Sequence, residues 1–194
     1  MKPGGRGPLH VATHLDPSEE HFMSDLTALI LDRIRDVPDY PKPGVVFKDI
    51  TPLLADHAVF CAVVDALADG FEADKIVGIE ARGFILAAPV AYQEGAGFVP
   101  VRKKGKLPAA VLEESYDLEY GSATIEVHDD AFSPGDRVLI VDDVLATGGT
   151  AAAAVELVRR TGAEVVGVSV LMELAFLKGR ERLTGVETRS LLIV

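Results

Sequence analysis

The sequence has very little cysteine and no long apolar segment. Cys61 is the single cysteine among 194 residues, which excludes an internal disulfide framework and is typical of a reducing compartment. No apolar run reaches the roughly 18 residues that a membrane-spanning helix needs. The first residues also lack the charged start and the continuous apolar core of a signal peptide. We therefore expect a cytoplasmic protein that does not enter a membrane.

Positive charge is scarce as well. The 19 Lys and Arg residues are outnumbered by 30 Asp and Glu residues, which gives a formal net charge of -11. Long-range repulsion therefore disfavours nonspecific binding to nucleic acid, and disfavours small polyanions unless positive charge is gathered locally. One stretch, "VRKKGK", gathers four basic residues: Arg102, Lys103, Lys104 and Lys106. A solvated turn is the commoner meaning of such a cluster, and an anion-binding site is the alternative.

The composition is that of one soluble globular domain. The hydrophobic fraction of 48% and the charged fraction of 25% are typical values, and the length suits a single domain. Residues 1–22 are rich in Gly, Pro, His and acidic residues without an apolar period, so we expect a disordered tail. The folded domain is expected over residues 23–194. Its first helix is predicted with Ser24 as N-cap and with an apolar face at Leu26, Leu29, Ile30 and Ile34.

Strand and helix patterns alternate along the rest of the chain. Strands are predicted at residues 75–80, 97–103, 122–128, 138–141, 164–174 and 190–194. Helices are predicted after Asp56, at residues 84–92, from the glycine-threonine loop to Arg160, and at residues 176–183. The prolines between residues 38 and 43 predict a loop, and residues 104–121 are interpreted as a long irregular connection. This order predicts an α/β fold with a mostly parallel central sheet flanked by helices.

The strand that ends at Val141 leads into two aspartates and a glycine-threonine loop. Ligands of open α/β sheets bind beyond the carboxyl ends of the strands, and Asp142 and Asp143 lie at such an end. The loop then enters a helix, where unpaired N–H groups and the helix dipole stabilise an anion without a basic side chain. Glycines let the backbone approach the anion, and threonine hydroxyls add donors. We predict a phosphate site formed by Ala146, Thr147, Gly148, Gly149 and Thr150.

The two carboxylates need a partner other than the phosphate. Carboxylates accept hydrogen bonds from sugar hydroxyls and bind Mg²⁺, usually through water. An exposed turn with an N-cap would explain a bare Asp-Asp pair, but not an apolar strand, two acids and "ATGGT" in register. The loop lacks the lysine of a Walker A motif, and Pro100 stands where the dinucleotide fingerprint would need its third glycine. A ligand that joins a phosphate to a ribose uses both features.

The stretch "VLIVDDVLATGGT" resembles the phosphoribosyl-pyrophosphate signature of the type I phosphoribosyltransferases. Four further stretches look, in this order, like motifs of the adenine branch of that family: "DYPKPGVVFKDITPLL", "GIEARGF", "VRKKGKLP" and "SYDLEYG". The resemblance covers roughly Ser24 to Val194. It implies the type I phosphoribosyltransferase fold with a flexible active-site loop. It also implies the reaction of adenine with 5-phosphoribosyl 1-pyrophosphate, which gives AMP and pyrophosphate.

The resemblance assigns the phosphoribosyl side of the site. Asp142 and Asp143 would hold the ribose hydroxyls, and the loop of residues 146–150 would cradle the 5-phosphate. Arg82 would lie in a pyrophosphate loop that often carries a non-proline cis peptide in this family. Lys103 and Lys106 would face the departing pyrophosphate, and Mg²⁺ would be bound mainly through the pyrophosphate substrate. Glu80 either helps to orient Arg82 or simply ends a strand.

The resemblance also assigns the base side. Val46 backbone groups would read the amine edge of the purine and Phe47 would stack on its ring, with Lys48 and Leu174 nearby. Position 48 is often arginine in the family, and a lysine weakens the case for a bidentate contact. Glu119, in the flexible loop, would handle a proton on the base. From residue type alone, a solvated loop acid is the commoner interpretation of Glu119.

Three functions remain open on the sequence alone. The first is adenine salvage, and the second is the same chemistry on hypoxanthine, guanine or xanthine, because only a few side chains decide the base. The third is a non-catalytic regulator that senses phosphoribosyl pyrophosphate and binds nucleic acid. Such regulators usually add a DNA-binding domain and a basic surface, and neither is recognisable here. The expected partners are therefore the two small substrates and, from the resemblance, a second copy of the chain in a homodimer, with no nucleic acid and no membrane.

Overall fold

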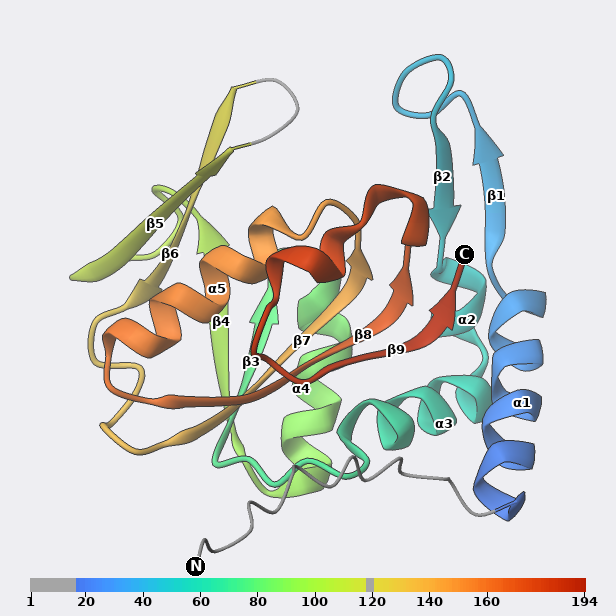
Figure 1. Cartoon of the computed structure of the whole chain (residues 1–194), viewed down its shortest axis with the longest axis horizontal. Coiled ribbons are helices and arrows are strands. Elements are labelled where there is room, and N and C mark those ends of the chain that lie inside the picture. The colour runs from blue at the N-terminus through green and yellow to red at the C-terminus, as the bar shows by residue number, and fades with distance from the viewer. Residues whose placement is uncertain (1–16, 118–120) are drawn as a thin grey trace, which may run out of the picture.

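A seven-stranded sheet forms the centre of the part of the chain that the computed structural model describes, residues 17–117 and 121–194 (Figure 1). Five neighbouring strands are parallel: β4 (Gly97–Lys103), β3 (Lys75–Ile79), β7 (Arg137–Leu145), β8 (Glu164–Glu173) and β9 (Thr188–Ile193). Beyond β4, the antiparallel strands β6 (Ser122–His128) and β5 (Val111–Asp117) extend the sheet. The predicted α/β fold with a mostly parallel sheet is confirmed.

Helices cover both faces of this sheet. They are α1 (Pro17–Asp32), α2 (Thr51–Ala55), α3 (His57–Ala68), α4 (Arg82–Glu94) and α5 (Gly149–Arg160). The first four pack on one face and α5 packs on the other, so the apolar residues form two cores (Figure 1). In β7, Leu139 and Val141 belong to the first core, whereas Val138 and Ile140 belong to the second. Burial on both faces explains why this strand is a continuous apolar run. No helix in the described residues is long and apolar enough to cross a membrane.

The order of the strands creates a crevice at one edge of the sheet. The chain leaves β3 through α4 and returns as β4 on one side, but it leaves β7 through α5 and returns as β8 on the other. Helices α4 and α5 therefore begin on opposite faces, beside the carboxyl ends of the neighbouring strands β3 and β7. Ligands of open α/β sheets bind at such a reversal of strand order. The loops after β3 and β7 are thus positioned to form a site.

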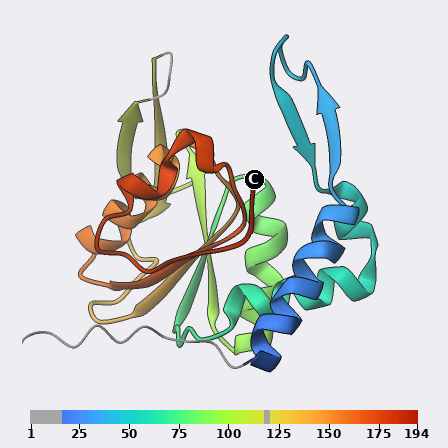
Figure 2. The same cartoon turned by 45° about the vertical axis from the view of Figure 1, so that its right-hand side comes forward.

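A two-stranded hairpin stands apart from the central sheet (Figure 2). It consists of β1 (Arg35–Pro38) and β2 (Val46–Asp49), paired antiparallel with Arg35 opposite Asp49. The prediction of a loop here was wrong for these strands. Pro38 is tolerated because it is the last residue of an edge strand, and the later prolines fall in the turn between the strands. The hairpin carries Val46, Phe47 and Lys48, which were predicted to contact the purine.

Other differences from the sequence predictions are local. Helix α1 begins at Pro17, well before the predicted N-cap Ser24, since proline is favourable at the first helical position. The rest of the predicted tail lies outside the described residues. Strand β5 lies in the predicted irregular connection and is held by its pairing with β6 rather than by an apolar pattern. The predicted helix at 176–183 is two short 3₁₀ turns, η1 (Ala175–Leu177) and η2 (Gly179–Arg182), separated by Lys178 in the left-handed region at φ 54°.

Candidate active site

A cavity of about 380 Å³ opens at the carboxyl ends of β3 and β7. Carboxyl ends of parallel strands meet at one edge of a sheet, so residues far apart in the sequence line this cavity together. Five of the predicted site residues are among them: Arg82, Lys103, Asp142, Asp143 and Thr150. Glu80 and Tyr116 also line the cavity. The structure therefore brings the acidic pair, Thr150, Arg82 and Lys103 to one cavity, whereas Lys106 and residues 146–149 are not among its lining residues.

The acidic pair lies within a strand rather than after it. Strand β7 continues to Leu145 and pairs with β8 along its length, whereas its pairing with β3 ends at Val141. Asp142 and Asp143 therefore have no neighbouring strand on the cavity side. Burial raises the pKa of Asp142 well above its usual range, and the adjacent Asp143 carboxylate raises it further. Burial also raises the pKa of Asp143, although the Arg82 guanidinium opposes that rise.

Arg82 connects the acidic pair to the β1–β2 hairpin. Its Nη2 atom lies 2.6 Å from Asp143 Oδ2, and its Nη1 atom donates a hydrogen bond of 3.0 Å to the Lys48 carbonyl oxygen. The guanidinium carbon also lies 4.8 Å from the centroid of the Phe47 ring, in a cation–π contact. The peptide bond between Glu80 and Ala81 is cis, as the family resemblance led us to expect for this loop.

The glycine-threonine loop is held against the η2 turn. Gly148 is the N-cap of α5 and has a φ of 78°, a left-handed conformation that glycine adopts without strain. A Cβ atom on Gly148 would lie 2.2 Å from the Gly179 carbonyl oxygen, and one on Gly179 would lie 2.2 Å from the Ala146 carbonyl oxygen. The two backbones are therefore in direct contact. At the other end of the loop, the Thr150 hydroxyl donates to the Tyr116 hydroxyl at 3.0 Å.

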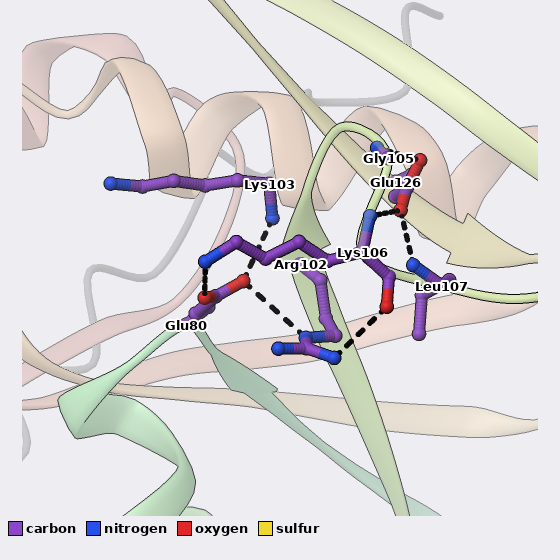
Figure 3. Close-up of polar contacts among 7 residues, drawn as sticks. All are labelled: Glu80, Arg102, Lys103, Gly105, Lys106, Leu107 and Glu126. Carbon is purple, nitrogen blue, oxygen red and sulfur yellow. Dashed lines mark hydrogen bonds and ion pairs between the residues drawn. The ribbon is translucent and has the colours of Figure 1, made fainter.

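The basic cluster gathers around Glu80 (Figure 3). The Lys106 ammonium lies 2.5 Å from Glu80 Oε1, and the Lys103 backbone N–H donates to Glu80 Oε2 at 3.1 Å. Arg102 Nε lies 3.4 Å from the same Oε2 atom. Glu80 is therefore bound to the basic cluster, and no ion pair joins it to Arg82 in the described residues. This is a third role, beyond the two that the sequence left open. The Lys103 side chain points away from Glu80, and its ammonium has no ion pair in the described residues (Figure 3).

The residues assigned to the base are arranged around the hairpin and the end of β8. Val46 is 52% exposed, and Phe47 meets Tyr40 edge to face with ring centroids 5.2 Å apart. The Lys48 ammonium pairs with Asp36 at 2.7 Å, so its charge is directed within the hairpin. Leu174 follows β8, and its N–H donates to the Leu145 carbonyl oxygen at 2.9 Å. Glu119 lies outside the described residues.

Sequence reasoning missed the residues that hold the η2 turn against the predicted phosphate loop: Glu173, Arg180 and Ser190. Glu173, only 5% exposed, accepts hydrogen bonds from Arg180 and from the Ser190 hydroxyl. These bonds hold the pKa of Glu173 below its ordinary value and anchor the η2 turn that touches Gly148. The available signal was an acidic residue at the end of an otherwise apolar strand, followed by a glycine-arginine pair.

Comparison with known proteins identifies the family. The Phosphoribosyl transferase domain matches residues 50–187 of the chain. The adenine phosphoribosyltransferase of Acidothermus cellulolyticus is 67% identical over 174 residues, which cover 88% of this chain and 98% of that protein. The chain belongs to the adenine phosphoribosyltransferase family. Solved adenine phosphoribosyltransferases have the same fold. The structure from Rhodothermus marinus is 52% identical with a TM-score of 0.85, covering 88% of this chain and 99% of that one.

A more distant adenine phosphoribosyltransferase comes from Saccharomyces cerevisiae. It is 35% identical with a TM-score of 0.81, and the match covers 87% of this chain and 99% of that one. That enzyme was solved in complex with an imino-altritol bisphosphate and adenine. The fold of the adenine phosphoribosyltransferases is therefore kept in this chain at the level of the whole domain.

Proposed function

We propose that this protein is a purine salvage enzyme that transfers the 5-phosphoribosyl group from 5-phosphoribosyl 1-pyrophosphate to adenine, giving AMP and pyrophosphate. One observation carries the proposal: the acidic pair, Thr150 of the predicted phosphate loop, and the basic residues Arg82 and Lys103 line one cavity at the strand-order reversal. The 67% identity to an adenine phosphoribosyltransferase and the adenine bound to the yeast relative support the choice of base.

In this proposal, different parts of the site hold different parts of the sugar substrate. Asp142 and Asp143 accept hydrogen bonds from the ribose hydroxyls, and the loop of residues 146–150 donates its N–H groups to the 5-phosphate. Asp143 Oδ2 is buried and, apart from its ion pair with Arg82, has no hydrogen-bond partner in the described residues. A ribose hydroxyl would give this buried oxygen a second donor beside Arg82.

The basic residues act on the leaving group. Displacement at the anomeric carbon develops positive charge on the ribose and negative charge on the departing pyrophosphate. The proposal assigns Arg82, Lys103 and Lys106 to stabilise the second charge. Arg82 and Lys103 line the cavity, and the Lys103 ammonium has no ion pair within the described part of the chain, whereas Lys106 would have to leave Glu80 or share it with the anion.

Mg²⁺ fits the chemistry of this site. The described residues contain no group of three or more His, Cys, Asp or Glu side chains placed to hold a metal, so the proposal assigns most of its ligands to the pyrophosphate oxygens. Asp142 and Asp143 offer hard carboxylate oxygens on the same cavity, which suit this ion directly or through water. When bound, Mg²⁺ neutralises charge on the leaving group.

The base is proposed to bind between the hairpin and the end of β8. Phe47 would stack on the purine, Val46 would read its amine edge, and Lys48 and Leu174 would complete the pocket. Arg82 supports this arrangement because it holds the Lys48 carbonyl and the face of the Phe47 ring. Glu119 is proposed as the acid-base group for the purine, on the strength of the "SYDLEYG" stretch in which it lies.

We also propose that the protein is a cytoplasmic homodimer. The single cysteine supports the compartment. Support for the dimer comes from α4, where Tyr92 is 90% exposed and Ile85, two turns away on the same helix face, is 46% exposed. Phe98, at the neighbouring strand β4, is also exposed. Large apolar side chains gathered on one surface are typical of a protein–protein contact.

Steady-state assays test this function. Pyrophosphate release is measured with adenine, hypoxanthine, guanine and xanthine in turn, and adenine is expected to give the highest kcat/KM. A higher value for guanine would move the protein to another purine. No release from folded protein with any base would favour a non-catalytic regulator.

The site assignment is tested by Asp142→Ala combined with Asp143→Ala, which is expected to abolish turnover through loss of the ribose contacts. The matched control is Asp129→Ala combined with Asp130→Ala, an adjacent and exposed aspartate pair, which is expected to keep normal kinetics. Near-normal kcat/KM in the first double variant would contradict the assignment.

A further inference from the structure

Beneath the basic cluster lies a buried carboxylate that the proposed reaction does not use. Glu126, on β6, is only 2% exposed. It accepts three hydrogen bonds from successive backbone N–H groups, those of Gly105, Lys106 and Leu107, at 3.0, 2.8 and 2.7 Å (Figure 3). Burial opposes ionisation, yet these N–H groups hold the pKa of Glu126 below its ordinary value. The charged carboxylate of Glu126 therefore binds the backbone N–H groups of one turn, residues 105–107.

This turn is held from other directions as well. Arg102 Nη1 donates to the Lys106 carbonyl oxygen at 3.0 Å, which closes the turn on itself. The Lys104 N–H donates to the Thr124 carbonyl oxygen at 3.0 Å and ties the start of the turn to β6. Gly105 has a φ of 81°, so the turn has the left-handed residue it requires. Among the acidic side chains of the described residues, only Glu126 accepts hydrogen bonds from the backbone N–H groups of residues 105–107. Glu80 instead pairs with the ammonium of the Lys106 side chain.

The side chain of Lys106 leaves this turn toward the cavity. Its ammonium lies 2.5 Å from Glu80, a cavity-lining residue, while the backbone of the same residue is bonded to Glu126 (Figure 3). A lysine side chain is flexible but has a limited reach, so its ammonium can meet Glu80 only from a restricted range of backbone positions. A buried carboxylate that loses its donors is strongly unfavourable, which makes this backbone position well defined.

We propose that Glu126 is a positioning residue that fixes residues 105–107 and thereby holds the Lys106 ammonium at the pyrophosphate side of the cavity. The identity of the anion rests on the function proposed above, but the fixing of the turn does not. Glu126 acts through the backbone of Lys106 and does not touch the substrate. Its removal affects binding of the anion more than binding of the base.

The test compares Glu126→Gln with Glu113→Gln in the full-length chain. Glutamine keeps the shape of Glu126 but offers one acceptor oxygen and a donor NH₂ to three N–H groups. Glu113 faces Glu126 directly across the β5–β6 pairing, and its carboxylate bonds the Lys104 ammonium instead of the turn backbone. Both variants remove the same formal charge from neighbouring positions. Only the first replaces one of the two acceptor oxygens that the turn uses by an NH₂ group.

The main readouts are calorimetric affinity for inorganic pyrophosphate with Mg²⁺, and the KM values for the two substrates. Glu126→Gln is expected to weaken pyrophosphate binding and to raise the KM for phosphoribosyl pyrophosphate, each by about tenfold. The KM for adenine is expected to stay within about twofold, and Glu113→Gln to stay within about twofold throughout. Amide hydrogen exchange at residues 105–107 is expected to accelerate in Glu126→Gln alone.

Two further variants separate positioning from loss of the fold. Glu126→Asp keeps the charge and is expected to retain more pyrophosphate affinity than Glu126→Gln. In a Lys106→Met background, Glu126→Gln is expected to have little additional effect, because the ammonium that it positions is gone. Unchanged pyrophosphate affinity in Glu126→Gln, or an undiminished effect in the Lys106→Met background, would overturn the proposal. If the unmodified chain makes no AMP but Glu126→Gln still weakens pyrophosphate binding, the proposed function fails and the positioning role stands.

Discussion

At the scale of single residues, Asp142 and Asp143 in β7 show how closely packed carboxylates oppose stability. Asp142 is packed closely enough that a Cβ atom on Gly83 would lie 2.7 Å from its Oδ1 atom. Its charge is desolvated and lies beside a second carboxylate, so its pKa is raised. The folded state therefore binds this proton more tightly than the unfolded chain does. The stabilisation belongs to the protonated form and is lost as the pH rises through the folded pKa.

We predict that Asp142→Asn raises the melting temperature at pH 7. The amide keeps the oxygen that accepts the Asp143 N–H at 2.9 Å, but removes the buried charge and its repulsion with Asp143. Each kcal/mol of relief corresponds to about 2–4 °C for a chain of this size. The fall in melting temperature between acidic and neutral pH is expected to be smaller in Asp142→Asn than in the unmodified chain. Turnover is expected to fall. Thermal unfolding at several pH values checks this, with the exposed Asp130→Asn as control. A lower melting temperature for Asp142→Asn at pH 7 would contradict the explanation.

At the scale of elements, the predicted phosphate loop, residues 146–150, is in backbone contact with η2. Gly148 and Gly179 touch through atoms that leave no space for a side chain on either residue. Arg180, next to Gly179, is bonded to the buried Glu173, to the Thr188 carbonyl oxygen and to Ser190. These hydrogen bonds hold the short η2 turn in place against Gly148 of the loop. Leu174 lies beside Glu173, so the same region also borders the proposed base pocket.

Gly179→Ala is expected to weaken binding of phosphoribosyl pyrophosphate by at least about tenfold, because the new methyl group must push the loop aside. The KM for adenine is expected to change much less. A suitable control is Gly185→Ala: Gly185 has a φ of 76°, and a Cβ atom there would meet no other atom within 4 Å. This control is expected to lower stability through backbone strain while leaving KM unchanged. Equal KM values for the two variants would show that the contact with η2 does not shape the loop.

At the scale of the whole molecule, the reversal of strand order and the two cores make the site possible. The sheet is buried on both faces, so the carboxyl ends of β3 and β7 form a stable frame from which loops project. The β1–β2 hairpin and the β5–β6 strands lie on opposite sides of the molecule (Figure 1). The apolar surface of α4 lies on the helix that begins with Arg82, so a contact there would lie close to the site.

We expect Tyr92→Asp to shift the protein from dimer to monomer, because a charge would be buried at the proposed contact. Sedimentation velocity at several concentrations measures this. Leu31→Asp makes a similar change at a 51% exposed apolar residue on α1 and is expected to leave the dimer intact. Dissociation by Leu31→Asp and not by Tyr92→Asp would place the interface on α1 and contradict the assignment to α4.

Much of the architecture was predictable because β3, β4, β7 and β8 are runs of apolar residues ended by turn signals. The β1–β2 hairpin was not predictable, because its prolines argue against strands and its pairing joins residues across a turn. Strand β5 was missed for a related reason: its charged residues conceal a strand that exists through pairing with β6. Local patterns predict elements well only when the element itself carries its apolar face.

The sequence by itself determined the class of ligand, because the strand, the acidic pair and the phosphate loop are contiguous and each supplies one part of the chemistry. Only the tertiary structure decided how the remaining charges are arranged. Arg82 meets Asp143 and Phe47, Lys106 meets Glu80, and Glu126 lies beneath the basic turn. These partners are distant in sequence and meet because the parallel strands β3 and β7, the antiparallel strand β6 and the separate hairpin are brought together by the fold. No local pattern records which side chains those ends bring within hydrogen-bonding distance.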